Sequence, residues 1–99
     1  MWKVEETEDV KAQFAKDFKN GLISFEDITI LKKWTQLMEK GGVEEICKHP
    51  IFDDHALDGD WKGYRSSCFS RSGRIIYKEE NGRFIIAVVR ITPDHNYKR

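Results

Sequence analysis

The sequence predicts one α+β domain over residues 1–99, with a short N-terminal strand and two antiparallel helices packed on one face of a twisted antiparallel sheet. Three observations predict this fold class. A chain of 99 residues has room for a single hydrophobic core. Apolar residues recur at helical spacing in the first half of the chain. The second half holds short β-branched and aromatic runs separated by turn residues, which is typical of consecutive antiparallel strands.

The first expected helix follows a short strand over residues 2–5. Thr7 can cap this helix, because a threonine hydroxyl accepts a hydrogen bond from a backbone N–H of the first turn. One helix face is apolar and consists of Val10, Phe14 and Phe18. We expect the helix to end near Asn20-Gly21, since glycine readily takes the left-handed conformation that ends helices.

The second expected helix begins after Ser24, which forms a capping-box pattern with Asp27. Its apolar stripe consists of Phe25, Ile28, Leu31, Trp34, Leu37 and Met38. The stripe ends at Gly41-Gly42, where we expect the helix to end. Residues 43–48 are then expected to form a short helical turn and residues 49–61 a loop.

Three strands are expected in the second half, over residues 63–69, 74–78 and 84–91. Asn81-Gly82 predicts a type I′ hairpin between the last two strands, and residues 70–73 form a looser turn between the first two. The last strand is apolar on both faces, so we place it inside the sheet rather than at an edge.

The composition excludes several classes of protein. Hydrophobic residues make up 39% of the chain, but no apolar run approaches the roughly 18 residues of a membrane span. The N-terminus lacks the basic start and apolar stretch of a signal peptide. Cys47 and Cys68 are isolated thiols, so neither a zinc site nor a disulfide framework is predicted, and both are expected to be reduced. We therefore expect a cytoplasmic protein without a membrane partner.

The formal net charge is +0, but the charges are distributed unevenly along the chain. Residues 1–60 carry eight Lys against fourteen Asp and Glu, whereas residues 61–99 carry nine Lys and Arg against three Asp and Glu. An arginine-rich half suits a phosphate backbone, because guanidinium groups remain charged and donate to phosphate oxygens in a planar fork. Alternatively, these arginines pair with the acidic half and form an ordinary mixed surface.

Two His and four Asp lie within residues 49–60, which invites a metal-binding interpretation. Their spacing fits no ligand template, including the calcium-binding helix–loop–helix pattern. We therefore expect neither a metal site nor a small-molecule cofactor. A solvated loop explains these residues as well.

His95 is the stronger candidate for proton transfer, because imidazole titrates near neutral pH and this one follows the last strand. If the hairpin folds as expected, Arg74 places a fixed positive charge near His95 and the Tyr97 phenol. Such a trio suits RNA cleavage by the RNA's own 2′-hydroxyl, without a metal. The alternative is that His95 and Tyr97 belong to a terminal tail without a catalytic role.

Residues 55–78 contain the pattern His-x-Leu-x-Gly-x-Trp-Lys-Gly-Tyr-Arg followed by the strand Arg-Ile-Ile-Tyr. Both motifs resemble the RelE/ParE superfamily of toxin–antitoxin toxins, in particular its YafQ/RelE mRNA interferase branch. The family's order of one strand, two helices and an antiparallel strand set also matches the elements expected above. The resemblance thus implies a RelE-like fold over nearly the whole chain.

The resemblance also implies a function and a set of residues. It implies the toxin of a type II toxin–antitoxin system: a ribosome-dependent mRNA endonuclease that inhibits translation and is neutralised by a cognate antitoxin. The implied catalytic residues are Arg74, His95 and Tyr97. The expected RNA-binding residues are His55, Trp61, Lys62, Arg65, Arg71, Arg90 and Lys98.

The sequence also departs from the family. Cys68 stands where YafQ-type toxins usually carry a further histidine, and Ser72 where they carry an acid. Neither replaces a proton carrier at neutral pH without a shifted pKa, and we expect Cys68 to be a small buried strand residue. Two alternatives remain: a ParE-like inhibitor of DNA gyrase, and a catalytically inactive RNA-binding module.

Overall fold

The computed structural model describes residues 2–83 and 85–93 and confirms an α+β domain. Its helices and strands are β1 (Lys3–Glu6), α1 (Glu8–Lys19), α2 (Phe25–Cys47), β2 (His55–Ala56), β3 (Arg65–Cys68), β4 (Arg74–Glu80) and β5 (Ile85–Thr92). Short 3₁₀ turns lie at η1 (Pro50–Phe52), η2 (Gly59–Trp61) and η3 (Asn81–Arg83). No helix in the described part of the chain is long and apolar enough to span a membrane.

The five strands form one sheet in the order β1-β5-β4-β3-β2. The pairs from β2 to β5 are antiparallel, as predicted, but β1 pairs with β5 in parallel, so the sheet is mixed. The chain leaves β1, passes through both helices and returns from the far side of the sheet, and such a crossover permits parallel pairing. The predicted internal position of the last strand is confirmed, because β5 has a partner on each side.

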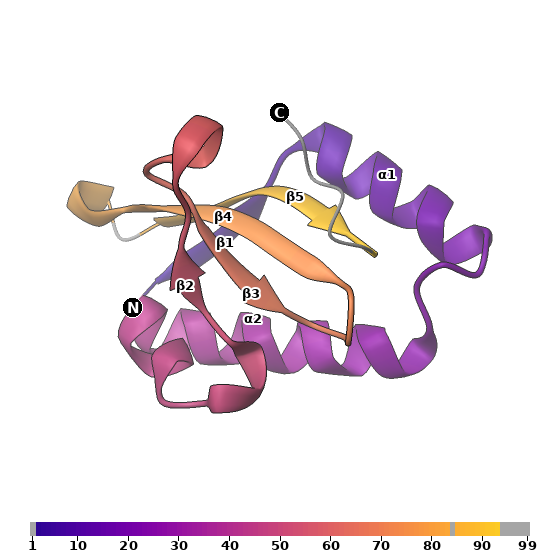
Figure 1. Ribbon diagram of the computed structural model, residues 1–99, viewed down its shortest axis with the longest axis horizontal. Helices are drawn as coiled ribbons and strands as arrows, with labels where there is room; N and C mark the ends of the chain where they lie inside the picture. The colour runs from indigo at the N-terminus through magenta and orange to yellow at the C-terminus, as the bar shows by residue number, and fades with distance from the viewer. Residues whose placement is uncertain (1, 84, 94–99) are drawn as a thin grey trace.

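Both helices pack on the same face of the sheet, as predicted. In Figure 1, α2 runs along the lower side of the sheet and α1 lies beside β5. The buried cluster between the layers contains Val10 from α1, several apolar residues of α2, and Ile75, Tyr77, Ile86 and Val88 from the two inner strands. Trp34 packs edge-on against Tyr77, with ring centroids 5.5 Å apart. This contact joins α2 to the middle of the sheet.

The helix starts predicted from the sequence are confirmed. The Thr7 hydroxyl accepts a hydrogen bond from the Val10 backbone N–H at 3.1 Å. Ser24 and Asp27 form a reciprocal capping box with two hydrogen bonds of 3.0 Å each. These caps satisfy backbone donors that the first turn of a helix leaves without partners.

The helix predicted to end at Gly41-Gly42 is interrupted there by the non-helical backbone of Gly42, and the helical turn expected over residues 43–48 continues to Cys47, so both predictions are confirmed and α2 consists of two helical segments joined by a kink. Gly42 takes φ 67° and ψ −153°, a conformation that only glycine adopts without strain. The indole of Trp2 lies directly against this glycine, and the Trp2 backbone N–H donates to the Glu39 carbonyl at 3.1 Å. The kink therefore allows the helix to pass close to the start of the chain.

Two predictions about the strands also require correction. Asn81-Gly82 does not form a type I′ turn: the pair begins the 3₁₀ turn η3, and the flanking residues Glu80 and Ile85 are the last to pair. The second difference is β2, which occupies part of the expected loop at 49–61. A strand of two residues has too short a pattern to show a period.

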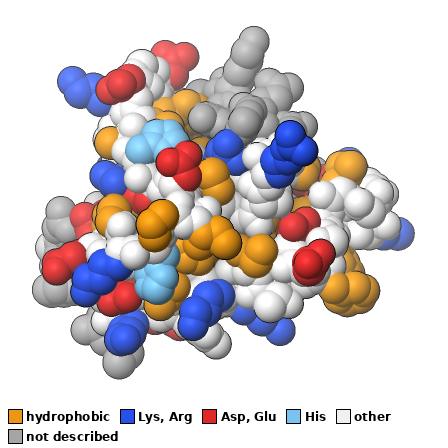
Figure 2. All heavy atoms as spheres, turned by 60° about the horizontal axis from the view of Figure 1, so that its bottom comes forward, with side chains coloured by type: hydrophobic (Ala, Val, Ile, Leu, Met, Phe, Trp, Pro, Cys, Tyr) orange, Lys and Arg blue, Asp and Glu red, His pale blue; other side chains and the backbone are white. Residues whose placement is uncertain are grey.

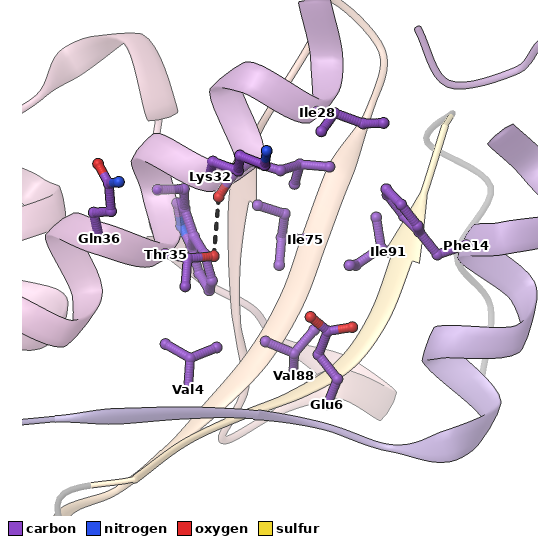
Figure 3. A pocket seen from close by; sticks show the side chains of 12 residues that line it. Val4, Glu6, Phe14, Ile28, Lys32, Thr35, Gln36, Ile75, Val88 and Ile91 are labelled. Atoms are coloured by element: carbon purple, nitrogen blue, oxygen red, sulfur yellow. Dashed lines mark hydrogen bonds between the residues drawn. The ribbon is translucent and has the colours of Figure 1, made fainter. Parts of the chain in front are cut away.

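An apolar hollow of about 360 Å³ lies between the helices and the sheet (Figure 3). Phe14, Ile28, Val88 and Ile91 are among the side chains that line it. The Thr35 hydroxyl at its wall donates to the Leu31 carbonyl at 2.9 Å. Glu6 and Lys32 also line the hollow, but its lining contains neither a histidine nor an arginine within the part of the chain that the structure describes.

We expect Gly42→Ala to lower the free energy of unfolding by about 2–4 kcal/mol. An alanine there keeps the strained backbone and brings its Cβ within 2.7 Å of Trp2 Nε1. Gly21→Ala is the matched control, because Gly21 also has positive φ but has no atom within 4 Å of an added Cβ. It should cost about 1 kcal/mol. Urea unfolding measures both, and equal losses would contradict the role given to Trp2.

Candidate functional site

The side chains of β4 alternate between the helix-covered face of the sheet and the opposite face. Ile75 and Tyr77 belong to the buried cluster under the helices. Successive residues of a strand point to opposite faces, so Arg74, Ile76 and Lys78 point away from the helices. This opposite surface is the open face, and its members on β2 to β5 are His55, Ser66, Cys68, Arg74, Ile76, Lys78, Glu80, Ile85, Ala87, Arg90 and Thr92.

Arg90 reaches the open face because of an irregularity in β5. Ile86 and Val88 lie in the buried cluster, so strict alternation would send Arg90 to the same side. The register between β4 and β5 shifts between Ile76 and Tyr77, and one extra residue on β5 reverses the alternation. Arg90 is therefore paired with Ile76 on the open face.

His55 is placed on the open face by the short strand β2, where it pairs with Ser66, which in turn pairs with Ile76. The imidazole is exposed, and its Nδ1 lies 2.8 Å from the Asp53 carbonyl oxygen. A carbonyl oxygen can only accept a hydrogen bond, so Nδ1 must donate. In neutral His55 the lone pair consequently lies on Nε2, which makes that atom a potential proton acceptor.

The residue before His55 anchors this part of the chain. The Asp54 carboxylate is buried, with 1% of its side chain exposed, and pairs with the Arg65 guanidinium at 2.7 Å. It also accepts hydrogen bonds from the Ser67 hydroxyl at 2.6 Å and from the Tyr77 phenol. Asp54 thereby ties the loop before β2 to both β3 and β4, and this fixes the position of His55.

The same contacts shift two pKa values. Burial raises the pKa of Tyr77 far above its ordinary value, and the neighbouring negative charge of Asp54 adds to the effect. Burial on its own lowers the pKa of Arg65, but the hydrogen bond and charge of Asp54 outweigh it, so the pKa is raised. Arg65 and Tyr77 therefore keep their protons at neutral pH, and both remain donors to Asp54.

Arg74 lies at the start of β4, and its guanidinium donates to the Gly73 carbonyl at 2.9 Å. Within the described residues no carboxylate pairs with Arg74, so its charge is not neutralised by that part of the protein. Cys68 is its partner on β3. Burial raises the pKa of the Cys68 thiol although Arg74 opposes the shift. Cys68 is half-buried and stays a neutral thiol, so it is unsuited to act as a base.

An aromatic pair lies over the other end of the open face. Trp61 and Tyr64, from the loop between β2 and β3, pack edge to face with ring centroids 5.3 Å apart. The Arg90 guanidinium lies 5.5 Å from the centre of the Trp61 ring, and the Lys78 ammonium lies 5.8 Å from that of Tyr64. These contacts bring the loop onto the same face as Arg74 and His55.

The structure thus brings four predicted site residues to one face: His55, Trp61, Arg74 and Arg90. Lys62 and Arg71 are exposed in the flanking loops. Arg65 does not join them, because its alternation and its ion pair with Asp54 direct it to the helix-covered side. Arg65 is thus a partner of the acidic half of the chain, and its contact with RNA stays a prediction.

Three predicted residues, His95, Tyr97 and Lys98, lie outside the described residues. The chain leading to them is anchored, because the Ser72 hydroxyl donates to the Pro93 carbonyl at 2.9 Å. Ser72 belongs to the turn that leads into β4 at Arg74. The described chain therefore ends beside the strand end that carries Arg74.

Sequence reasoning missed Lys78, Tyr64 and the anchoring role of Asp54. Lys78 follows Arg74 by four strand positions, so strict alternation from Arg74 could have identified it. The role of Asp54 had no local signal, because its partners on β3 and β4 are 11 to 23 residues away along the chain.

The surface of the molecule is mixed in charge. Figure 2, in which the lower side of Figure 1 is turned toward the viewer, shows exposed imidazoles among interspersed positive and negative side chains. Arg71, Arg74 and Lys78 nevertheless pair with no carboxylate within residues 2–83 and 85–93. In the same part of the chain no three His, Cys, Asp or Glu side chains lie close enough together to hold a metal ion.

Tyr77→Phe tests the anchor at Asp54. At neutral pH we expect a loss of about 1.5–3 kcal/mol in unfolding free energy, because a hydrogen bond to a buried carboxylate disappears. The raised pKa of Tyr77 also predicts a pH dependence. Above about pH 10 the Tyr77 phenol ionises in the unfolded chain but stays protonated in the folded protein, so the wild type loses stability as the pH rises. The difference between the two proteins should shrink by about 1.4 kcal/mol from pH 8 to pH 11. A constant difference in denaturant unfolding would contradict the raised pKa.

No family model and no curated protein matches the chain. Solved structures do match it over nearly its whole length. YafQ from E. coli is 20% identical, with a TM-score of 0.72 over 93% of this chain and 92% of that one. A copper-bound mutant toxin from Helicobacter pylori is 24% identical, with a TM-score of 0.75 over 96% of both chains. The YoeB–YefM complex from Staphylococcus aureus matches at 11% identity and a TM-score of 0.69, over 100% of this chain and 99% of that one. The chain therefore has the RelE-like fold of these toxins, as its sequence motifs predict.

Proposed function

We propose that the protein is the toxin of a type II toxin–antitoxin system and cleaves ribosome-bound mRNA without a metal ion. The observation that carries this proposal is the open face, where Arg74, without a carboxylate partner in the described chain, shares one surface with the exposed imidazole of His55. The fold shared with known toxins and the motifs of residues 55–78 support the same assignment.

The reaction begins with attack of an RNA 2′-hydroxyl on the adjacent phosphorus. The bond from the 2′-oxygen to phosphorus forms, and the bond from phosphorus to the 5′-oxygen of the next nucleotide breaks. A base takes the 2′-hydroxyl proton, and an acid returns a proton to the departing 5′-oxygen. Arg74 stabilises the additional negative charge on the phosphoryl oxygens, because a guanidinium donates to two oxygens at once.

Two imidazoles are candidates for the proton steps. His55 offers Nε2 as an acceptor, because its Nδ1 donates to the Asp53 carbonyl. This adds a catalytic role to the RNA contact expected from the sequence. His95 and Tyr97 remain predicted catalytic groups, and the described chain ends two residues before His95, next to the turn that carries Ser72. We assign proton acceptance to His55 and leave proton donation to His95, with Tyr97 in support.

The ribosome would supply the orientation of the mRNA strand that this site cannot impose by itself. Arg74 and His55 lie on the surface of a sheet, and neither lines the apolar hollow on the helix side. A surface with few groups orients a flexible strand poorly, and orientation contributes a large part of the rate in such reactions. We therefore expect cleavage of mRNA held in the decoding site and slow cleavage of free RNA. This places the activity in the cytoplasm.

An antitoxin is the proposed protein partner. The YoeB–YefM structure from S. aureus is a toxin–antitoxin complex, and the E. coli YafQ toxin has been solved with DinJ. By analogy, a cognate antitoxin would cover the open face, where Arg71, Arg74 and Lys78 have no ion pair in the described chain. Acidic side chains on the antitoxin would suit these three cations.

Arg74→Ala should reduce cleavage of ribosome-bound mRNA by about 100-fold or more and relieve growth arrest, because the transition-state charge loses its donor. Arg83→Ala is the matched control: Arg83 is an exposed arginine in η3, at the far end of β4, paired only weakly with Glu80 at 3.7 Å. It should cleave like the wild type. Circular dichroism should show both variants folded.

The same assay separates the alternatives. Mapping of transcript 5′ ends after induced expression should show cuts at one position within codons. Growth arrest without such cuts, and with full toxicity in Arg74→Ala, would remove the nuclease and favour a gyrase inhibitor. RNA binding without cleavage or arrest would favour an inactive binding module.

A further inference from the structure

We propose that Trp61, Tyr64, Lys78 and Arg90 form a stacking subsite for a purine base of single-stranded RNA. The inference rests on the proposed function and specifies how its substrate is held. These four residues, the aromatic platform, combine two neighbouring rings with two cations. Aromatic rings interleaved with Lys and Arg are the usual means by which proteins hold unpaired bases.

The platform lies on the same surface as the proposed catalytic groups. Lys78 and Arg90 both belong to the open face, and each contacts one of the two rings. Along β4, Lys78 follows Arg74 by four residues, which corresponds to about 13 Å. A single short RNA strand can therefore place a phosphate at Arg74 and a base at the platform.

Backbone hydrogen bonds close the loop that carries the platform. The Leu57 backbone N–H donates to the Tyr64 carbonyl at 2.9 Å, and the Tyr64 N–H donates to the Trp61 carbonyl at 3.0 Å. The loop backbone is thus held by its own hydrogen bonds. Both rings remain half-exposed, whereas Ile76 on the same face is fully buried. Exposed ring surface of this kind is available to a ligand.

The two rings favour a base over a phosphate as the ligand of the platform, because a phosphate has no π-face to stack on an aromatic ring. A nucleobase is neutral, and its π-face stacks on an indole or on a guanidinium plane. A purine presents more stacking surface than a pyrimidine, and this predicts a preference for adenine or guanine at one codon position.

The direct test is binding of 2′-O-methyl RNA tetramers, which cannot be cleaved by 2′-hydroxyl attack, to the Arg74→Ala protein. Binding is followed by the fluorescence anisotropy of a dye-labelled tetramer, a signal that does not depend on the ring being replaced. We expect the oligoadenylate to bind about tenfold more tightly than the oligouridylate. Trp61→Leu in the same background should remove this difference, and Trp61→Phe should keep most of it, because a ring remains.

Two further variants complete the experiment, one as a control and one as a substitute for Trp61→Leu. Phe25→Leu removes an aromatic ring that is 79% exposed but lies at the start of α2, outside the open face, and should leave both affinities unchanged. Tyr64→Leu replaces Trp61→Leu in the test if the latter variant does not fold. It should weaken the binding of oligoadenylate more than the binding of oligouridylate.

Equal affinity for the two tetramers, no detectable binding of either, or an undiminished preference in Trp61→Leu would each overturn the subsite. This readout does not depend on cleavage. If the protein prefers oligoadenylate but never cuts mRNA, the platform proposal stands and the nuclease proposal is overturned. If it cuts mRNA but shows no preference between the tetramers, only the platform proposal is overturned.

Discussion

The buried carboxylate of Asp54 is the constraint on which the candidate site depends. It joins three segments, because Arg65 and Ser67 come from β3, Tyr77 comes from β4, and Asp54 itself precedes β2. Removing one partner of a buried ion pair typically costs about 3–5 kcal/mol, since the other charge is left without compensation. The network therefore holds β2 against β3, although β2 itself has only two residues. His55 acquires its place on the open face through this network and not through a regular strand of its own.

The network and the catalytic candidates occupy opposite faces of the same strands. Tyr77 points toward Trp34 and Asp54 on the helix side, while its neighbours Ile76 and Lys78 point to the open face. One face therefore supplies rigidity, and the other carries the side chains to which we assign the chemistry. This division depends on the irregularity in β5, which moves Arg90 from the helix-covered face to the open face and pairs it with Ile76. A cation that strict alternation would direct to the helix side thus reaches the open face.

Much of the fold was predictable because its signals are local. Thr7, Ser24 and Asp27 cap the helices as expected, and β-branched runs mark the two long antiparallel strands. The corrections concern interactions distant in sequence. The parallel pairing of β1 depends on a strand more than 80 residues later. The same distinction applies to the candidate site: motifs in the sequence indicated Arg74 and His55, whereas the ion pair between Arg65 and Asp54 leaves no periodic pattern.

The most direct test of the account is cleavage of ribosome-bound mRNA that carries a single 2′-deoxy nucleotide at the cut position. If the open face promotes attack by the 2′-hydroxyl, this substitution abolishes cleavage there, and the unmodified mRNA yields a 2′,3′-cyclic phosphate and a 5′-hydroxyl end. Cleavage of the deoxy substrate at an undiminished rate, or a 5′-phosphate product, would show that water is the nucleophile. The roles given to Arg74 and His55 would then be contradicted.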